Sequence, residues 1–308
     1  MDKISKCSPT TPMHVTEDFG LVSIIMPTYK QYILLHKAVE SIKNQTYKNW
    51  ELIVIDDNPD ELYRKLNEQY FKDLQHSQIK YIQNDGNMGS TASRNRGIEC
   101  SSGEYITFLD DDDWYEQFKI EKQLEAMHST QSDISVCNLI LLNEQGKVVD
   151  CRRRKYLKKK ENTITAHLKY HITGTDTMMF RADFLKKIGG FDKENLGDEF
   201  YLMMKALQHN PKFIHVDYDG VFALVHSQTG LSSGNNKLLT EKILLEYKAR
   251  YFHTLKKRDI RYIKMRHHLV VAVAHKKNKA YHRCFVELLK AFLLAPIGMF
   301  HILMGADR

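Results

Sequence analysis

The chain has 308 residues, 43% of them hydrophobic and 27% charged, which is the composition of a globular protein with one large or two modest domains. Its five cysteines are odd in number and lack CxxC spacing, so neither a disulfide framework nor a zinc site is indicated. The formal net charge of +7 is uneven, because residues 250–283 hold eleven Lys or Arg and one acid, and such a surface suits an anionic partner, either nucleic acid or a membrane.

Residues 1–20 are polar, with two prolines and no apolar segment of signal-peptide length, so we expect a flexible tail on a protein of the cytoplasm. The next segments alternate between two periods. Apolar runs that end in acids or a turn predict strands, namely LVSIIMP at 21–27, WELIVIDD at 50–57 and EYITFLDD at 104–111. Helical spacing separates the first two, with Leu35, Ala38, Val39 and Ile42 on one face.

The same alternation continues through residues 61–74, 79–83 and 91–101, and it is typical of a Rossmann-like α/β fold with a mostly parallel sheet and flanking helices. Ligands of such sheets collect at the carboxyl ends of the strands. We therefore expect the loops at 27–29, 56–58 and 110–113 to converge on one edge.

The second half of the chain predicts a helix at 116–128, a strand pair turning near Gly146, a basic loop at 152–160, a helix at 197–209 and two further strands near 212–226. From Leu238 onward the pattern is helical. We predict a catalytic domain at 21–236, with halves at 21–115 and 116–236, and a C-terminal extension at 237–308.

The last apolar stretch, residues 284–304, is close to the length of a membrane span, but Glu287, Lys290, Pro296 and His301 interrupt it. We expect this segment to lie in a membrane interface, with the preceding basic helix against anionic headgroups. A helical cap packed on the domain and a true span remain alternatives. The basic loop at 152–160 is either a site for a diphosphate-lipid acceptor or the membrane surface, or a solvated loop.

Four aspartates in a row, Asp110 to Asp113, follow the third strand. Carboxylates that repel one another need full exposure to water or a compensating cation. Mg²⁺ and Mn²⁺ take oxygen ligands, usually one or two carboxylates together with the oxygens of a diphosphate. A metal site and a solvated acidic turn are therefore the two readings.

Three segments in register resemble glycosyltransferase family 2 on a GT-A fold: VSIIMPTYKQYILLHKAVESIKNQTYKNWELIVIDDNPD, NMGSTASRNRGIECSSGEYITFLDDDDWY and GGFDKENLGDEFYLMMKAL. The likeness covers roughly residues 21–232. It implies inverting transfer of a sugar from a nucleotide-sugar donor, expected to be a UDP-sugar, with Mn²⁺ or Mg²⁺. The implied acceptor is a lipid-linked oligosaccharide or polysaccharide of the cell surface.

The resemblance also implies roles for the residues that bind the donor. Pro27, Thr28 and Tyr29 match the loop that holds the nucleobase and ribose, and Asp57, with Asp56 beside it, matches the acid that touches the base. Arg94 matches an arginine near the donor phosphates, where a guanidinium and a helix N-terminus both favour negative charge.

The aspartate run permits two frames of the family's DxD motif. Asp110 with Asp112 fits one frame, and Asp111 with Asp112 or Asp113 fits the other, so Asp112 is the first choice as metal ligand, with Asp110 beside it and Asp111 toward the donor. His226 matches a late histidine near the metal or diphosphate in some relatives, and its alternative is a structural role.

The family places its catalytic base, usually in an ED pair, at the head of a helix, whereas this chain has GDEF. Asp198 and Glu199 are both candidates, and their alternative role is to interact with the helix dipole. Trp114 and Tyr115 either line the acceptor cleft or pack behind the aspartates.

Other classes of function fit less well. The first strand leads to PTYKQY rather than GxGxxG, which argues against a nicotinamide cofactor. A nucleotidyltransferase and a basic nucleic-acid-binding protein are the remaining alternatives, although we find no nucleic-acid module and expect no nucleic-acid partner. We expect a peripheral enzyme on the cytoplasmic face of the cell membrane, bound to its anionic surface.

Overall fold

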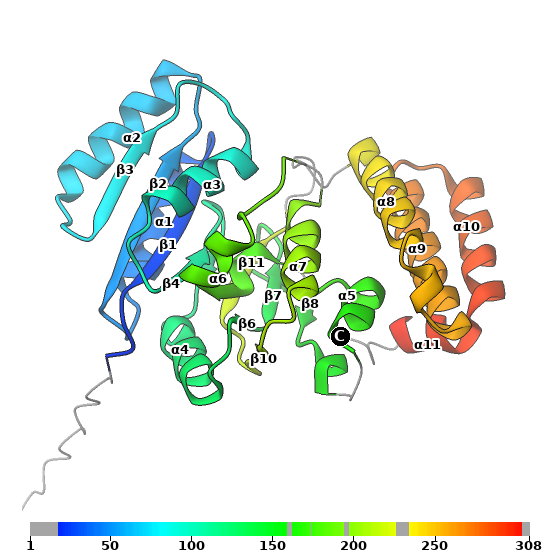
Figure 1. Ribbon diagram of the computed structural model, residues 1–308. Coiled ribbons are helices and arrows are strands. Elements are labelled where there is room, and N and C mark those ends of the chain that lie inside the picture. The colour runs from blue at the N-terminus through cyan, green and yellow to red at the C-terminus, as the bar shows by residue number, and fades with distance from the viewer. Residues whose placement is uncertain (1–17, 159–161, 173, 194–196, 226–233, 304–308) are drawn as a thin grey trace, which may run out of the picture.

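The computed structural model describes residues 18–158, 162–172, 174–193, 197–225 and 234–303 (Figure 1). Within these residues the main sheet has seven strands in the order β10-β6-β9-β4-β1-β2-β3. Their bounds are β1 (Val22–Thr28), β2 (Trp50–Asp56), β3 (Ile79–Gln83), β4 (Tyr105–Phe108), β6 (Ile134–Val136), β9 (Met178–Arg181) and β10 (Phe213–His215). β9 runs antiparallel to β4 and β6, and the other neighbouring pairs are parallel.

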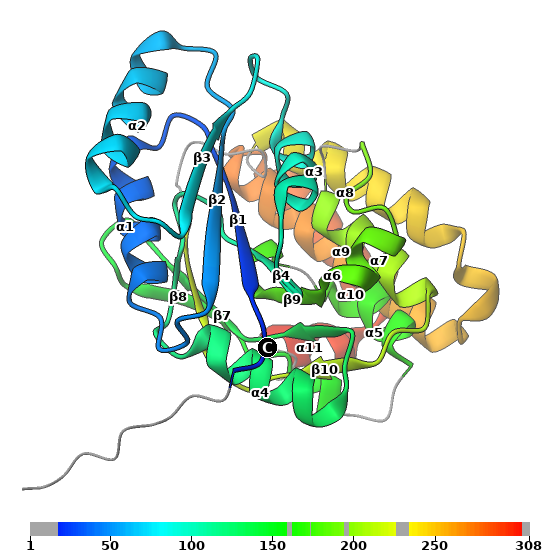
Figure 2. The same ribbon diagram turned by 60° about the vertical axis from the view of Figure 1, so that its left-hand side comes forward.

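The central strands are mostly apolar and almost entirely buried, since helices cover both faces of the sheet. Every residue of β2 is buried. Figure 2 shows α1 (Tyr32–Lys43) and α2 (Glu61–Leu74) on one side of β1 to β3 and α3 (Ser90–Cys100) on the other. The first layer also includes α4 (Lys119–Thr130), and α6 (Ala182–Lys187) and α7 (Asp198–Gln208) lie on the side of α3.

Gly97 allows α3 to approach β1 closely. A Cβ atom at this position would lie 2.3 Å from Cγ2 of Ile25, so a larger residue would push the helix away from the sheet. The close approach brings the first turns of α3, including Arg94, to the edge of the sheet where β1 and β4 end.

A smaller sheet in the order β5-β11-β7-β8 lies beside the main one. Its strands are β5 (Trp114–Tyr115), β7 (Leu139–Leu142), β8 (Val148–Arg152) and β11 (Val221–Leu224). The predicted turn at Gly146, with a φ of +75°, joins β7 to β8. The 3-10 helix η1 (Lys155–Lys158), α5 (Thr163–Tyr170) and a second 3-10 helix, η2 (Thr175–Thr177), lead from this sheet back to β9.

The C-terminal part is helical, as predicted, with α8 (Gly234–Ala249), η3 (Phe252–Thr254), α9 (Lys257–Lys277), α10 (Tyr281–Leu294) and α11 (Pro296–Leu303). Leu244 and Ile263 share a core with Leu168 and Phe200, so α8 and α9 are anchored to α5 and α7. α10 lies outermost, beyond α9, on the right of Figure 1.

The predicted α/β class, the mostly parallel sheet and the helical C-terminus are therefore confirmed. The domain boundaries stay a prediction, with α8 beginning at Gly234, close to the expected boundary. Two details differ from expectation. Gly20, expected in the flexible tail, accepts a hydrogen bond at its carbonyl oxygen from the Tyr47 hydroxyl at 2.6 Å. Arg154, expected in a basic loop, is 2% exposed and donates to Thr177 Oγ1 at 3.0 Å.

Candidate active site

The three predicted loops meet at the carboxyl edge of the main sheet. Thr28 at the end of β1 is in register with Asp56 at the end of β2, and the amide of Asp57 donates to the carbonyl oxygen of Thr28 at 2.9 Å. The amide of Tyr29 donates to Asp111 Oδ2 at 2.9 Å, which ties the first loop to the aspartate run. Burial raises the pKa of Asp111 well above its ordinary value.

Asp57 organises the turn that leads into α3. Its Oδ1 accepts from the side-chain amide of Asn84 at 2.7 Å and from the amide of Met88 at 2.8 Å, and its Oδ2 accepts from the amide of Gly89 at 2.8 Å. The neighbouring Asp56 is fully buried and bonded to Asn67. Asp57 therefore positions α3, and its predicted contact with a nucleobase stays a prediction.

Arg94 links the two halves of the predicted catalytic domain. Its Nη2 lies 2.6 Å from Asp110 Oδ1, after β4, and its Nη1 lies 2.7 Å from Asp198 Oδ2, at the head of α7. Burial disfavours the charged guanidinium, but the two carboxylates outweigh that effect and raise the pKa of Arg94. Among the described residues its buried Nε–H has no acceptor.

The described residues contain one acidic group with the spacing of a metal site, formed by Asp110, Asp113 and Asp176, with one carboxylate oxygen of each within 4.8 Å of the others. Asp176 Oδ1 also accepts from the amide of Asp110 at 3.1 Å. Burial, and then Asp110, raise the pKa of Asp176 to about 7. The pKa of Asp113 is raised well above its ordinary value by burial and by Asp176.

This geometry fits a hard divalent cation, because three carboxylates supply oxygen ligands and their mutual repulsion disfavours full ionisation without a positive charge. Asp110 is a predicted ligand, and the other two acids of the group are Asp113 and Asp176. Asp112, our first choice, is half-buried and lies outside the group. His226 lies outside the described residues, and its predicted role stays a prediction.

Asp198 and Glu199 occupy the first turn of α7, which begins after Gly197 with a φ of +76°. Asp198 Oδ2 is held by Arg94, and its Oδ1 accepts from the amide of Glu199 at 3.0 Å. Burial, followed by the adjacent Asp198, raises the pKa of Glu199 to about 8. The two acids therefore differ: Asp198 is held by Arg94, whereas the pKa of Glu199 is raised by its burial and by Asp198.

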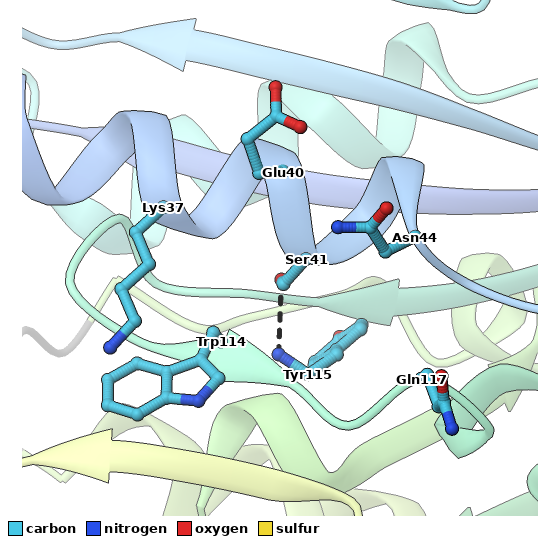
Figure 3. Close-up of a pocket in the computed structure, with 7 residues that line it drawn as sticks. All are labelled: Lys37, Glu40, Ser41, Asn44, Trp114, Tyr115 and Gln117. Carbon is cyan, nitrogen blue, oxygen red and sulfur yellow. Dashed lines mark hydrogen bonds between the residues drawn. The ribbon is translucent and has the colours of Figure 1, made fainter.

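Trp114 and Tyr115 lie on the side of the aspartate run that faces α1. They line a cavity of about 280 Å³ together with Lys37, Glu40, Ser41, Asn44 and Gln117 (Figure 3). The amide of Tyr115 donates to Ser41 Oγ at 3.1 Å, and its ring is buried. Lys37 Nζ lies 2.9 Å from the centre of the Trp114 ring. Tyr115 therefore packs behind the aspartates, which was one of the two expectations.

Sequence reasoning missed Asp176 and Lys119. Asp176 precedes an antiparallel strand, so the rule that ligands follow parallel strands does not find it, and the only signal was a single acid two residues before the apolar run MMF. Lys119 is fully buried and donates to Thr107 Oγ1 at 2.6 Å. Burial lowers its pKa to about 7. Lys119 is the first residue of the amphipathic helix α4, and its sequence position did not indicate that it would be buried.

Comparison with known proteins connects this geometry to a family. The model of the family described as Glycosyl transferase family 2 matches residues 23–189, which is more than half of the chain. An uncharacterized glycosyltransferase of Methanocaldococcus jannaschii is 30% identical over 201 residues, covering 64% of this chain and 68% of that protein.

Two bacterial relatives carry more specific names. The UDP-Glc:alpha-D-GlcNAc-diphosphoundecaprenol beta-1,3-glucosyltransferase WfgD of Escherichia coli is 30% identical over 198 residues, covering 63% of this chain and 72% of WfgD. The putative teichuronic acid biosynthesis glycosyltransferase TuaG of Bacillus subtilis is 32% identical over 160 residues, covering 52% of this chain and 61% of TuaG.

Solved structures share the fold at low sequence identity. TarS of S. aureus, in complex with UDP-GlcNAc, superposes with a TM-score of 0.57 at 17% identity, covering 88% of this chain and 89% of the TarS chain. The mannosyltransferase PcManGT of Pyrobaculum calidifontis, in complex with GDP-Man and Mn²⁺, has a TM-score of 0.59 at 16% identity, covering 92% and 81%. The predicted GT-A fold is thereby confirmed, and the family match over residues 23–189 shows that the chain is a glycosyltransferase of family 2.

Proposed function

We propose that the chain is a metal-dependent inverting glycosyltransferase that moves a sugar from a UDP-sugar to a hydroxyl of a lipid-linked or polysaccharide acceptor. The observation that carries this proposal is the placement of Asp110, Asp113 and Asp176 beside an arginine that also holds Asp198. A divalent cation supplies the positive charge that the three carboxylates lack, and the diphosphate of the donor supplies further oxygen ligands to that cation.

Asp110, Asp113 and Asp176 would hold Mn²⁺ or Mg²⁺, which acts as a Lewis acid and neutralises charge on the departing diphosphate. The fit rests on oxygen donors of the right hardness and on the raised pKa of Asp176, about 7, which a nearby cation would lower.

The donor side of the site is formed by β1, β2 and α3. Tyr29 is 41% exposed beside Asp111, where it can contact the nucleobase, and Asp57 fixes the loop that precedes α3. The unpaired Nε–H of Arg94 suits a phosphate oxygen, since a buried donor without an acceptor is costly. Arg94 thereby orients the diphosphate and stabilises negative charge as it leaves.

On the acceptor side, Glu199 is the proposed base. A single displacement requires a group that removes the proton of the acceptor hydroxyl while its oxygen attacks the anomeric carbon and the bond to the diphosphate breaks. Glu199, with a pKa of about 8, is a strong proton acceptor in its ionised form, which makes up about a tenth of the group at pH 7, whereas Asp198 is held by Arg94. Asp198 is therefore a positioning residue that keeps Glu199 proton-accepting through its negative charge.

The names of the relatives support the acceptor class. WfgD is named for a lipid diphosphate acceptor and TuaG for teichuronic acid biosynthesis, and TarS was solved with UDP-GlcNAc. We propose accordingly that this enzyme acts in cell-surface glycan synthesis, and we propose from its basic and apolar C-terminal segment that it is peripheral to the cytoplasmic face of the cell membrane.

A donor screen tests the proposal. Purified chain is incubated with UDP- and GDP-sugars, with Mn²⁺ or with a chelator, and released nucleoside diphosphate and pyrophosphate are both measured. We expect metal-dependent release of UDP and no pyrophosphate. Pyrophosphate release would establish nucleotidyl transfer instead, and UDP release at full rate in the chelator would refute the metal assignment.

A further inference from the structure

The outermost C-terminal helices carry a broad exposed apolar face. On α10, Tyr281, Phe285, Phe292 and Leu293 are 67%, 67%, 55% and 73% exposed, and on α11 Ile297 and Phe300 are 72% and 61% exposed. We call this the α10–α11 face, and it also includes the exposed Leu288 and Leu289. Monomeric water-exposed surfaces rarely gather so many large apolar side chains in one place.

The α10–α11 face points away from the rest of the protein. The opposite side of α10 is inward, where Ala291 is fully buried and Glu287 accepts from His268 of α9 at 2.5 Å. The exposed residues recur at intervals of three and four along α10, as on one side of an amphipathic helix. These apolar side chains are exposed, and α10 is the outermost helix in Figure 1.

The shape of the face favours lying along a bilayer over crossing it. Among the described residues, none of the helices is by itself both long and apolar enough to span a membrane. Residues 281–294 and 296–302 satisfy the length and composition criteria only together, and they meet at an angle of 116°. A chain bent so strongly does not form one straight span.

Basic residues border this face at the start of α10. Lys276, Lys277, Lys279 and Arg283 are all exposed, and residues 276–283 contain no acid. Such a cluster beside an apolar helix face complements the anionic headgroups of a membrane. A second copy of this chain would present the same positive border and would meet it with repulsion.

We propose that the α10–α11 face docks onto the surface of a bilayer that contains anionic lipids, with its apolar side chains in the headgroup boundary and residues 276–283 against the headgroups. Docking there holds α8 and α9, and through Leu244 and Phe200 the first turn of α7, at a fixed height above the lipid. The inference rests on the peripheral location given under the proposed function and names the surface that attaches, and it does not depend on the transfer reaction.

Vesicle flotation of the full chain tests this proposal. We compare phosphatidylcholine vesicles with vesicles that also contain phosphatidylglycerol, and measure the bound fraction. The double variant Phe285→Glu/Leu293→Glu is expected to lower the partition coefficient at least about tenfold, because burying each large apolar side chain contributes about that factor. A matched control, Leu62→Glu/Val148→Glu, changes two exposed apolar residues of α2 and β8 by the same charge and should float like wild type.

The electrostatic part has its own pair of variants. Lys276→Gln/Lys277→Gln/Lys279→Gln should lower binding to the anionic vesicles by about tenfold or more and leave binding to pure phosphatidylcholine unchanged, whereas Lys65→Gln/Lys72→Gln/Lys147→Gln should have a much smaller effect. Circular dichroism of each variant confirms folding, and release of UDP from donor is followed in parallel, so that failure to float and failure to transfer are read separately.

Absence of wild-type flotation on anionic vesicles would overturn the proposal, as would equal flotation of the Phe285→Glu/Leu293→Glu variant. A wild-type dimer in light scattering that the same variant converts to a monomer, without vesicle binding, would assign the face to a second copy instead.

Discussion

Glu199→Gln is expected to change how stability depends on pH, and this links the proposed base to a measurable free energy. The pKa of Glu199 is raised from 4.5 to about 8, so between these values the folded chain holds a proton that the unfolded chain has lost. The free energy of unfolding contributed by this group therefore falls by about 1.4 kcal/mol for each pH unit through that window. Below pH 4.5 the group is protonated in both states and imposes no cost.

Glutamine does not titrate, so the advantage of the variant over wild type should grow with pH. Between about pH 6 and pH 8 the difference in unfolding free energy is expected to increase by about 2 kcal/mol and then to level off. Urea unfolding followed by circular dichroism at several pH values measures it. Glu99→Gln, at an exposed position of α3, serves as the control and should show no such growth.

Parallel pH profiles for wild type and Glu199→Gln would refute the reasoning, because the carboxyl would then ionise in the folded chain as it does in the unfolded one. The same variant should lose sugar transfer while keeping donor binding. Loss of both would indicate a role at the donor side.

Three further predictions concern the groups around this site. Asp176→Asn should weaken Mn²⁺ binding, measured by calorimetry without donor, by about tenfold or more, and unchanged affinity would remove Asp176 from the site. Arg94→Lys should lower kcat/KM about tenfold or more, since an ammonium cannot hold Asp110 and Asp198 with the same fork, and wild-type kinetics would contradict the bridging role. Lys119→Met should stabilise the fold by about 4 kcal/mol at pH 7, because burial lowers the lysine pKa from 10.5 to about 7 and the native chain bears the cost of that charge at neutral and lower pH. That gain should shrink as pH rises toward 10.5, and a pH-independent difference in urea unfolding would count against it.

The convergence of the three loops could be predicted from the sequence because local patterns determine it. β1, β2 and β4 are apolar runs that end in polar loops, and parallel strands bring those ends to one edge. The loops at 27–29, 56–58 and 110–113 converge there as expected. The ends of neighbouring parallel strands always meet at one edge of a sheet, so the predicted convergence of these loops is confirmed.

The partners of the acids could not be predicted in the same way. Asp176 reaches the aspartate run only because β9 inserts antiparallel between β4 and β6, a pairing between segments about 70 residues apart along the chain that no local period encodes. Which members of a run of four aspartates turn inward depends on backbone torsions in one short turn. The attachment of Arg94 to Asp198 likewise depends on how α3 and α7 pack.

With the donor and acceptor placed as proposed, Arg94 makes the two substrates of the reaction interdependent. One guanidinium braces a carboxylate on the donor side and another on the acceptor side, so any ligand that takes charge from Asp110 alters the force on Asp198. Thermodynamic reciprocity then requires that an occupied acceptor site change the affinity for the sugar nucleotide by the same factor. The contacts of Arg94 thus predict that the affinity for each substrate, measured with the other substrate present, will differ from its affinity measured alone.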